Sequence, residues 1–164
     1  MRSLIQPQFR AERIEKAAER IKDKYNPKTT EDLIQIAKEE YGVNEVIYSP
    51  VFLGSAAYRI NNDIYIFYNR TIKPYERFAI SHEIGHIAAG HLNGLKNPGF
   101  FTCEFEADYF AQLINNSSAI KHNLLRTADA IFLTYQMIKY PFIRKKEIQK
   151  LKELGLEEFI KQSG

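Results

Sequence analysis

Two amino-terminal segments place hydrophobic residues at the spacing of amphipathic helices. The first runs as far as Asn26-Pro27, and among its many charges lie the apolar positions Phe9, Ile14, Ala17, Ala18, Ile21 and Tyr25. The second begins at Thr29 or Thr30, either of which can cap a helix, and stops at Gly42. Its inward face comprises Leu33, Ile34, Ala37 and Tyr41. The pattern therefore predicts two helices that each pack one face against the rest of the protein.

The pattern changes at residue 43, where β-branched and aromatic residues become frequent. Three short runs, 43–48, 56–60 and 64–68, have the composition of strands. Between the last two, Asn61-Asn62-Asp63 tolerates a left-handed backbone and predicts a tight hairpin turn. We expect a small antiparallel sheet packed on helices, which makes the fold class α+β. An extended peptide could pair with the edge formed by residues 64–68.

A third helix follows, and it carries the residues with the clearest chemistry. Pro74 and Glu76 suit its first turn. Its apolar residues cluster on one face and are Ile80, Ile84, Ile87 and Ala88. His82 and His86 lie one turn apart on the other side, where both imidazoles can bind one metal ion. Glu83 completes a His-Glu-x-x-His pattern, in which the carboxylate can act as a general base.

A catalytic zinc site needs a third protein ligand, and a downstream helix can supply it. Beyond a loop at residues 97–99, Glu104 and Asp108 share one helical face, so Glu104 is the preferred ligand and Asp108 could hold a ligand histidine from behind. Glu106 competes for the ligand role, but it lies about 200° around the helix and would then be exposed or salt-bridged. If the third helix continued, His91 would point toward its apolar side, so we expect a structural role for it.

The remaining side chains of this region are expected either to pack in the core or to be candidate donors to an oxyanion. We expect the core to include Cys103, Phe105, Phe110 and Leu113. No motif identifies the donor that would stabilise an oxyanion, and the candidates by composition are His91, Tyr109 and Arg77.

Three stretches carry a family resemblance. They are Arg77-Phe78-Ala79-Ile80-Ser81-His82-Glu83-Ile84-Gly85-His86, the pair Gly90-His91, and Glu104-x-Glu106-Ala107-Asp108-x-Phe110-Ala111-x-Leu113. Over residues 43–113 the chain resembles the ImmA/IrrE family of zinc metallopeptidases. The resemblance implies a zincin-like domain of gluzincin type, with His82, His86 and Glu104 as zinc ligands and Glu83 as the general base. The chain departs from the family at Asp108, where the family usually has Asn, and in lacking a proline shortly after Leu113.

Composition bounds the class of protein. The chain has 164 residues, 45% of them hydrophobic, which suits one domain over residues 1–164. With one cysteine there is no intramolecular disulfide, and no charged-then-apolar leader opens the sequence, so we expect a cytoplasmic protein. No stretch approaches the roughly 18 apolar residues of a membrane helix. Much of the net charge of +3 lies at residues 144–152, where a solvated helix face explains it better than direct nucleic-acid binding.

Beyond residue 116 the sequence predicts C-terminal helices. Ser118 and Thr127 could cap short helices, and the apolar positions assigned to packing are Ile120, Leu124, Leu125, Ala130, Ile131, Leu133, Met137 and Ile138. Pro141 interrupts them, and a charged helix covers residues 143–154. In the family this region resembles part of a helix-turn-helix, but the modest net charge favours helices that only pack beneath the site.

Together these features predict a zinc-dependent metalloendopeptidase. With Zn²⁺ on three protein ligands one position remains for water, whose proton Glu83 could take and later pass to the leaving amine. The resemblance implies that the substrate is a helix-turn-helix repressor or another transcriptional regulator, of the kind carried by phages and mobile elements. A different interpretation is a non-proteolytic, zinc-containing regulatory or antitoxin-like module that binds a protein. A third is a zinc hydrolase of small peptides or amides.

Overall fold

The computed structural model describes residues 6–49, 54–69, 73–93 and 100–118, together with isolated positions between 121 and 152. In chain order the elements are α1 (Gln6–Tyr25), α2 (Thr30–Tyr41), β1 (Val43–Tyr48), β2 (Ser55–Ile60), β3 (Asp63–Tyr68), α3 (Lys73–Ala88), the 3₁₀ turn η1 (His91–Asn93) and α4 (Phe100–Ile114). The predicted α+β class is confirmed. None of the described helices combines the length and apolar composition needed to span a membrane.

The first two helices end where their sequences predict. Asn26 has a φ of 45° and follows the last residue of α1. Thr29 is the N-cap of α2: its side chain accepts a hydrogen bond from the Asp32 N–H at 3.1 Å, and the Asp32 carboxylate accepts one from the Thr29 N–H at 2.7 Å. This reciprocal pair satisfies two backbone donors that the helix itself leaves unpaired. Gly42 closes α2 in the left-handed conformation, with a φ of 64°.

The sheet has the strand order β1-β3-β2 and is mixed. β3 pairs in parallel with β1 and antiparallel with β2, so the expectation of a purely antiparallel sheet is wrong. β3 takes the centre because it is the most apolar strand, and four of its six residues are buried. The alternation of side chains along a strand does not encode the direction of its neighbour. Because β3 is hydrogen-bonded on both sides, residues 64–68 form no edge where a peptide could pair.

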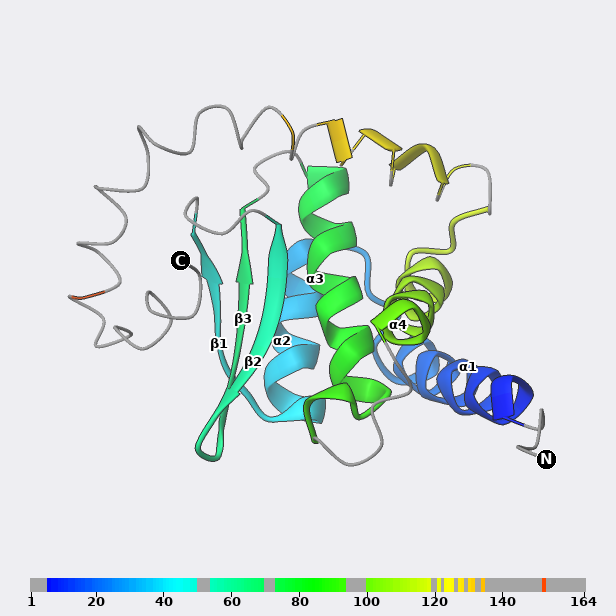
Figure 1. The fold of residues 1–164 in the computed structure, drawn as a ribbon, viewed down its shortest axis with the longest axis horizontal. Helices are drawn as coiled ribbons and strands as arrows, with labels where there is room; N and C mark the ends of the chain where they lie inside the picture. Colours follow the sequence, from blue (N-terminus) through cyan, green and yellow to red (C-terminus); the bar gives the residue numbers. More distant parts are fainter. Residues whose placement is uncertain are drawn as a thin grey trace.

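The helices form layers beside the sheet. Figure 1 shows α2 and α3 next to the strands, with α1 and α4 beyond them. One hydrophobic cluster joins all of these layers, and its largest fully buried members are Ile21, Leu33, Ile36, Ile66, Ile80, Ile84, Phe110 and Ile114. β2 is the strand that lies nearest α3 in this view. The layering therefore places one edge of the sheet beside the helix that carries the two histidines.

The predicted core residues of α4 divide into two groups. Cys103 and Phe110 are buried and Leu113 is partly buried, as expected. Phe105 is 68% exposed, so its assignment to the core is wrong, and its ring stacks on that of Tyr109 instead. α4 has apolar residues on several sides, so periodicity alone could not select the side that faces α3.

Only part of the C-terminal prediction falls on described residues. Ser118 accepts a hydrogen bond from the Lys121 N–H at 3.3 Å, as a cap would, whereas the Thr127 hydroxyl donates to the Asn123 carbonyl one turn back and is no cap. Leu124 and Ile131 are 66% and 67% exposed, so their predicted packing is wrong. A helical spacing of apolar residues does not guarantee that a partner covers them. The predictions for Ile120, Leu133, Met137, Ile138 and residues 143–154 lie outside the described residues.

α3 and α4 lie in close contact at Gly85. A Cβ built on this glycine would lie 2.8 Å from the carbonyl oxygen of Ala107, 2.9 Å from its Cα and 3.1 Å from the Cβ of Phe110. The first two of these atoms belong to the backbone of α4, so no side-chain rotation can relieve the overlap. The glycine is therefore required by the packing of the two helices.

We expect Gly85→Ala to destabilise the protein. Alanine gains up to about 1 kcal/mol of helix propensity, but overlap with backbone atoms that cannot rotate away costs roughly 2–3 kcal/mol, the upper part of the usual range, which leaves a net loss of about 1–2 kcal/mol. The melting temperature, measured by circular dichroism, should fall by about 2–8 °C, since ~1 kcal/mol corresponds to roughly 2–4 °C at this size. Thr102→Ala, at an exposed position on α4, is the control and should change stability by less than about 0.5 kcal/mol. An unchanged melting temperature for Gly85→Ala would contradict the close packing.

Candidate metal centre

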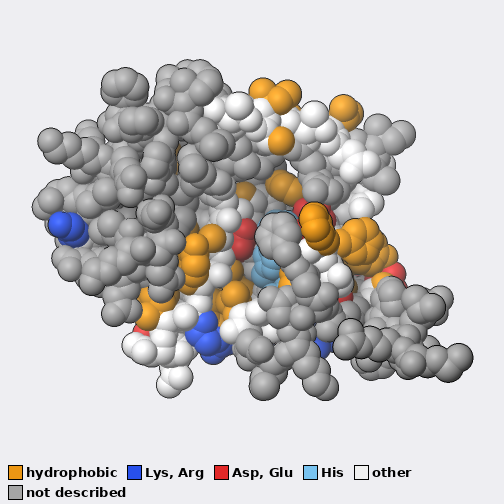
Figure 2. Space-filling view, in the orientation of Figure 1, with side chains coloured by type: hydrophobic (Ala, Val, Ile, Leu, Met, Phe, Trp, Pro, Cys, Tyr) orange, Lys and Arg blue, Asp and Glu red, His pale blue; other side chains and the backbone are white. Residues whose placement is uncertain are grey.

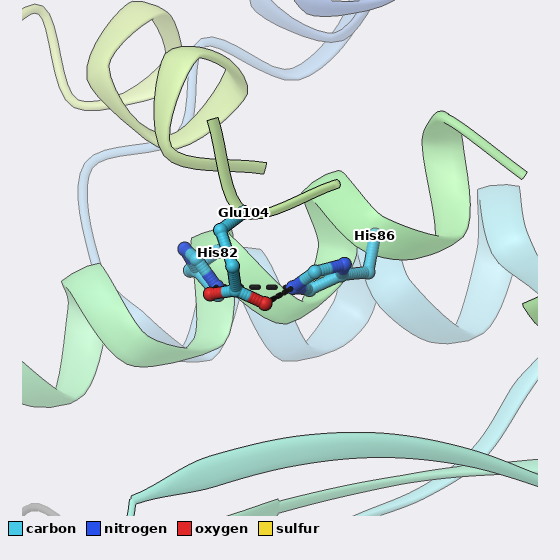
Figure 3. A group of neighbouring side chains, drawn as sticks. All are labelled: His82, His86 and Glu104. Carbon is cyan, nitrogen blue, oxygen red and sulfur yellow. Dashed lines mark hydrogen bonds and ion pairs between the residues drawn. The ribbon is translucent and has the colours of Figure 1, made fainter. Parts of the chain in front are cut away.

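Three side chains from two helices converge on one point. His82 and His86 come from successive turns of α3, and Glu104 comes from the second turn of α4. Their potential ligand atoms all lie within 4.8 Å of one another. Figure 3 shows both imidazoles and the carboxylate turned toward a common space. The structure thus brings together the three residues that the sequence analysis selected as ligands.

The distances in this group match those of a metal site. The two Nε2 atoms lie 3.0 Å apart, and each lies 3.4 Å from an oxygen of Glu104. A tetrahedral zinc ion with bonds of about 2.0–2.1 Å holds neighbouring ligand atoms roughly 3.3 Å apart. Two imidazoles and one carboxylate are also a ligand set that zinc favours in catalytic sites. The residues therefore fit a zinc ion.

Asp108 lies behind His82. The Nδ1 atom of His82 donates to Asp108 Oδ1 at 2.9 Å, and Asp108 is buried. A proton held on Nδ1 leaves Nε2, which faces Glu104 and His86, as the nitrogen that can bind a metal ion. This is the arrangement expected from the shared face of residues 104 and 108.

His91 differs from its predicted position, and its partner is Glu106. α3 ends at Ala88, and Gly90 has a φ of 79°, so the chain reverses and His91 does not continue the helix toward its apolar side. Instead, His91 Nδ1 lies 2.8 Å from His86 Nδ1, and His91 Nε2 lies 2.8 Å from Glu106 Oε2. Glu106 is buried and forms a salt bridge with His91, so the salt-bridged alternative predicted for it is confirmed and the exposed alternative is wrong. Gly90 is the signal in the sequence that could have indicated the end of the helix.

The convergent residues line a cleft with a volume of about 370 Å³. One wall comes from the edge strand β2, and the lining comprises Ser55, Ala56, Ala57, Tyr58, His82, Glu83, His86, His91, Leu92, Cys103 and Glu104. On the face of the molecule that Figure 2 shows, imidazole atoms are visible beside carboxylate atoms and hydrophobic side chains. Glu83 reaches the cleft although only 4% of its surface is exposed.

Two of the three candidate oxyanion donors lie outside the cleft. Arg77 donates to Asn115 Oδ1 at 2.7 Å and to the carbonyls of Thr29 and Pro27 at 2.8 and 2.9 Å, which ties α3 to the residue after α4 and to the loop before α2. The Tyr109 hydroxyl donates to Glu15 on α1. Their assignment by composition was therefore wrong, because composition carries no information on direction. His91 does line the cleft.

Tyr58 lines the cleft and was not selected from the sequence, where it is one aromatic residue of a strand. Burial, together with the negative charge of Glu83, raises the pKa of the Tyr58 phenol. The phenol therefore keeps its proton at neutral pH and can act as a hydrogen-bond donor.

Negative charge accumulates around the two ligand histidines. Glu83, Glu106 and Asp108 are buried and Glu104 is partly buried, while no lysine or arginine is among the described residues that line the cleft. Hydrogen bonds from His82 and His86 hold the pKa of the Glu104 carboxyl well below its usual range, against the effect of burial. Buried carboxylates in such numbers are costly without a compensating cation. A divalent ion would supply that compensation.

The same carboxylates act on His82. Burial lowers the pKa of this imidazole, but the hydrogen bonds to Asp108 and Glu104 and the charge of Glu83 outweigh burial and raise the pKa to about 10. Without a metal, His82 is therefore protonated at pH 7. A metal ion can bind only the unprotonated Nε2, so it must displace this proton.

We expect zinc binding at pH 7 to release about one proton from His82. In Asp108→Asn the pKa of His82 falls toward its ordinary value, so zinc should release fewer protons. Isothermal titration calorimetry in buffers of different ionisation enthalpy gives the number of protons directly. Zinc binding with no net proton release by the unmodified protein would contradict the proposed charge state of His82.

Neither protein-family models, nor curated proteins, nor solved structures match this chain. The resemblance to ImmA/IrrE peptidases therefore rests on the motifs themselves. Conclusions about function follow from the side chains around His82 and His86 and from their geometry.

Proposed function

We propose that this protein is a zinc-dependent metalloendopeptidase with a zincin-like domain. The observation that carries the proposal is the convergence of two imidazoles from α3 and one carboxylate from α4, with the carboxylate of Glu83 in the same cleft. Three protein ligands are typical of catalytic zinc sites, whereas structural sites usually have four. The His-Glu-x-x-His pattern and the resemblance to ImmA/IrrE peptidases support the same conclusion.

His82, His86 and Glu104 would hold the zinc ion. When bound, zinc would supply Lewis-acid chemistry, polarising the carbonyl of the scissile bond and lowering the pKa of water. The protein contributes the orientation of these ligands through the rigid packing of α3 on α4.

Glu83 would be the general base and then the general acid. Its carboxylate, between the two ligand histidines in sequence, borders the cleft. It would take a proton from the attacking water and deliver that proton to the nitrogen of the leaving amine. Because Glu83 is nearly inaccessible to solvent, the proton passes within a site of low dielectric, where such interactions are strong.

Tyr58, in the wall of the cleft formed by β2, could donate a hydrogen bond to the oxyanion that develops on the scissile carbonyl. Its phenol borders the same cleft as Glu83 and remains protonated at neutral pH. A hydrogen bond that strengthens as negative charge develops on the carbonyl oxygen accelerates the chemical step more than it strengthens substrate binding.

β2 is the strand that would align an extended peptide. It pairs with β3 along one edge, and no other described strand lies along its second edge. Residues 55–57 are Ser, Ala and Ala, which leave space in the wall of the cleft. A peptide added along this edge would pass across the ligand group, which replaces the predicted docking edge at residues 64–68.

The substrate class is proposed from the family resemblance. ImmA/IrrE peptidases cleave repressors or other transcriptional regulators, often of phages and integrative elements. We accordingly propose a helix-turn-helix regulator as the protein substrate and the cytoplasm as the site of action. A cleft beside a strand edge suits an extended segment of such a protein.

Replacing Glu83 by Gln tests the enzymatic function. We expect Glu83→Gln to bind zinc as the unmodified protein does, while hydrolysis falls by at least about 10²–10⁴-fold, since the proton-transfer group is lost. The assay is cleavage of helix-turn-helix regulators, taken first from the genes that neighbour this one, followed by electrophoresis and mass spectrometry. Glu45→Gln, the same change at an exposed position on β1, is the control and should retain activity.

The outcomes separate the alternative functions. If Glu83→Gln still inactivates the regulator, the protein is a zinc-containing binding module and not a peptidase. If the unmodified protein cleaves short peptides but no regulator, it is a hydrolase of small substrates.

Tyr58→Phe tests the oxyanion role. Loss of one such donor lowers kcat by roughly 10²–10³-fold, and we expect KM and zinc affinity to change little. Tyr65→Phe, directly across the strand pair on β3 and outside the described cleft lining, is the matched control. An equal kcat in Tyr58→Phe and in the unmodified protein would assign the oxyanion contact to another group.

A further inference from the structure

We propose that Glu106 and His91 are positioning residues that set the tautomer and the direction of His86 for metal binding. The proposal rests on the metal centre proposed above. For His91 the sequence predicted a structural role or an oxyanion contact, and for Glu106 a competing ligand role or a salt bridge, so neither was predicted to position His86. Neither contacts the position between the ligand atoms, so both would act through His86.

The order of the hydrogen bonds determines where each proton lies. Glu106 as a carboxylate can only accept, so His91 Nε2 carries a proton and donates it across 2.8 Å. A neutral His91 then has a lone pair on Nδ1. His86 Nδ1, at 2.8 Å, must therefore be the donor in the next hydrogen bond. The proton of His86 thus lies on Nδ1, and its Nε2 is left for the metal.

The alternative protonation gives a different result. If His91 were an imidazolium in a simple ion pair with Glu106, its Nδ1 would donate to His86. His86 Nδ1 would then have no proton, and a neutral His86 would carry its proton on Nε2. That proton would occupy the position where the metal must bind. A structural ion pair and a positioning pair therefore predict opposite tautomers of His86.

Helix geometry explains why His91 is needed. Glu104 and Asp108 lie one turn apart on α4, so Asp108 reaches His82 directly. Glu106 lies about 200° around α4 from Glu104 and cannot reach His86 in the same way. His91 spans the gap, because the end of α3 at Ala88 and the positive φ of Gly90 bring its ring between His86 and Glu106.

The side chains of His91 and Glu106 are both buried, with only 7% and 6% of their surface exposed. A buried carboxylate is costly unless it is paired, so a solvated salt bridge does not explain this arrangement. With a divalent ion on His86, the charge of Glu106 is compensated through two imidazoles, and the carboxylate makes His86 a more basic ligand.

Two substitutions at one position test the proposal. His91→Phe keeps the ring volume but removes both nitrogens, whereas His91→Asn keeps an acceptor near the position of Nδ1. Zinc affinity is measured on the full chain at fixed pH by competition with a chromophoric chelator. We expect His91→Phe to weaken zinc binding about 10–100-fold, and His91→Asn to recover most of this loss. Tyr109→Phe, which alters a contact of α4 with α1, should bind zinc like the unmodified protein.

A spectroscopic measurement gives an independent result. Nitrogen-detected imidazole spectra of the zinc-loaded, ¹⁵N-labelled protein should show the proton of His86 on Nδ1 and that of His91 on Nε2. A proton on His91 Nδ1 would overturn the proposal, as would unchanged zinc affinity in a folded His91→Phe variant. If His91→Phe does not fold, the tautomers in the unmodified protein decide the question. Absence of zinc binding by the unmodified protein would instead refute the metal centre itself, and with it the proposed function.

Discussion

The close packing of α3 against α4 is the constraint on which the rest of the site depends. Gly85 lies between the two ligand histidines and allows the backbone of α4 to approach to a distance that any side chain would prevent. This approach places Glu104 at 3.4 Å from both imidazoles and Asp108 behind His82. The geometry of the candidate metal ligands is thus a consequence of helix packing. Ala107, at the point of contact, is fully buried.

α4 supplies three carboxylates. They contact different groups because they point in different directions around the helix axis. Glu104 faces the space between the histidines, Asp108 holds the ring of His82, and Glu106 reaches His91 on the other side. Rigid helices hold such groups more accurately than loops do. The concentration of negative charge supports the proposal of a divalent cation at this site, since the described lining of the cleft contributes no basic side chain other than histidine.

The sheet contributes to function through its edge. Because β3 occupies the centre, the edge strand β2 is left beside α3 and forms a wall of the cleft. Tyr58 thereby shares the cleft with Glu83, although 25 positions separate them in the sequence. The small side chains of residues 55–57 leave the backbone of this edge open to an extended peptide. The fold and the proposed reaction are consistent in this respect.

The sequence by itself determined the features that depend on local periodicity. The sequence predicted the limits of α2 at Thr29 and Gly42, the common face of His82 and His86, and the common face of Glu104 and Asp108. Each of these follows from residues within one or two turns of one another. These predictions agree with the structure because neighbouring residues in a helix have a fixed angular relation.

Only the tertiary structure decided the rest. The parallel pairing of β1 with β3, the exposure of Phe105 and the contact of His91 with Glu106 depend on which segments meet in space. The end of α3 at Ala88 illustrates the reason. A short change of backbone direction there moves His91 from the predicted apolar side to His86, and no angular rule extends past the end of a helix. Contacts between distant segments are selected by the packing of the whole core, which the spacing of residues along one segment does not contain.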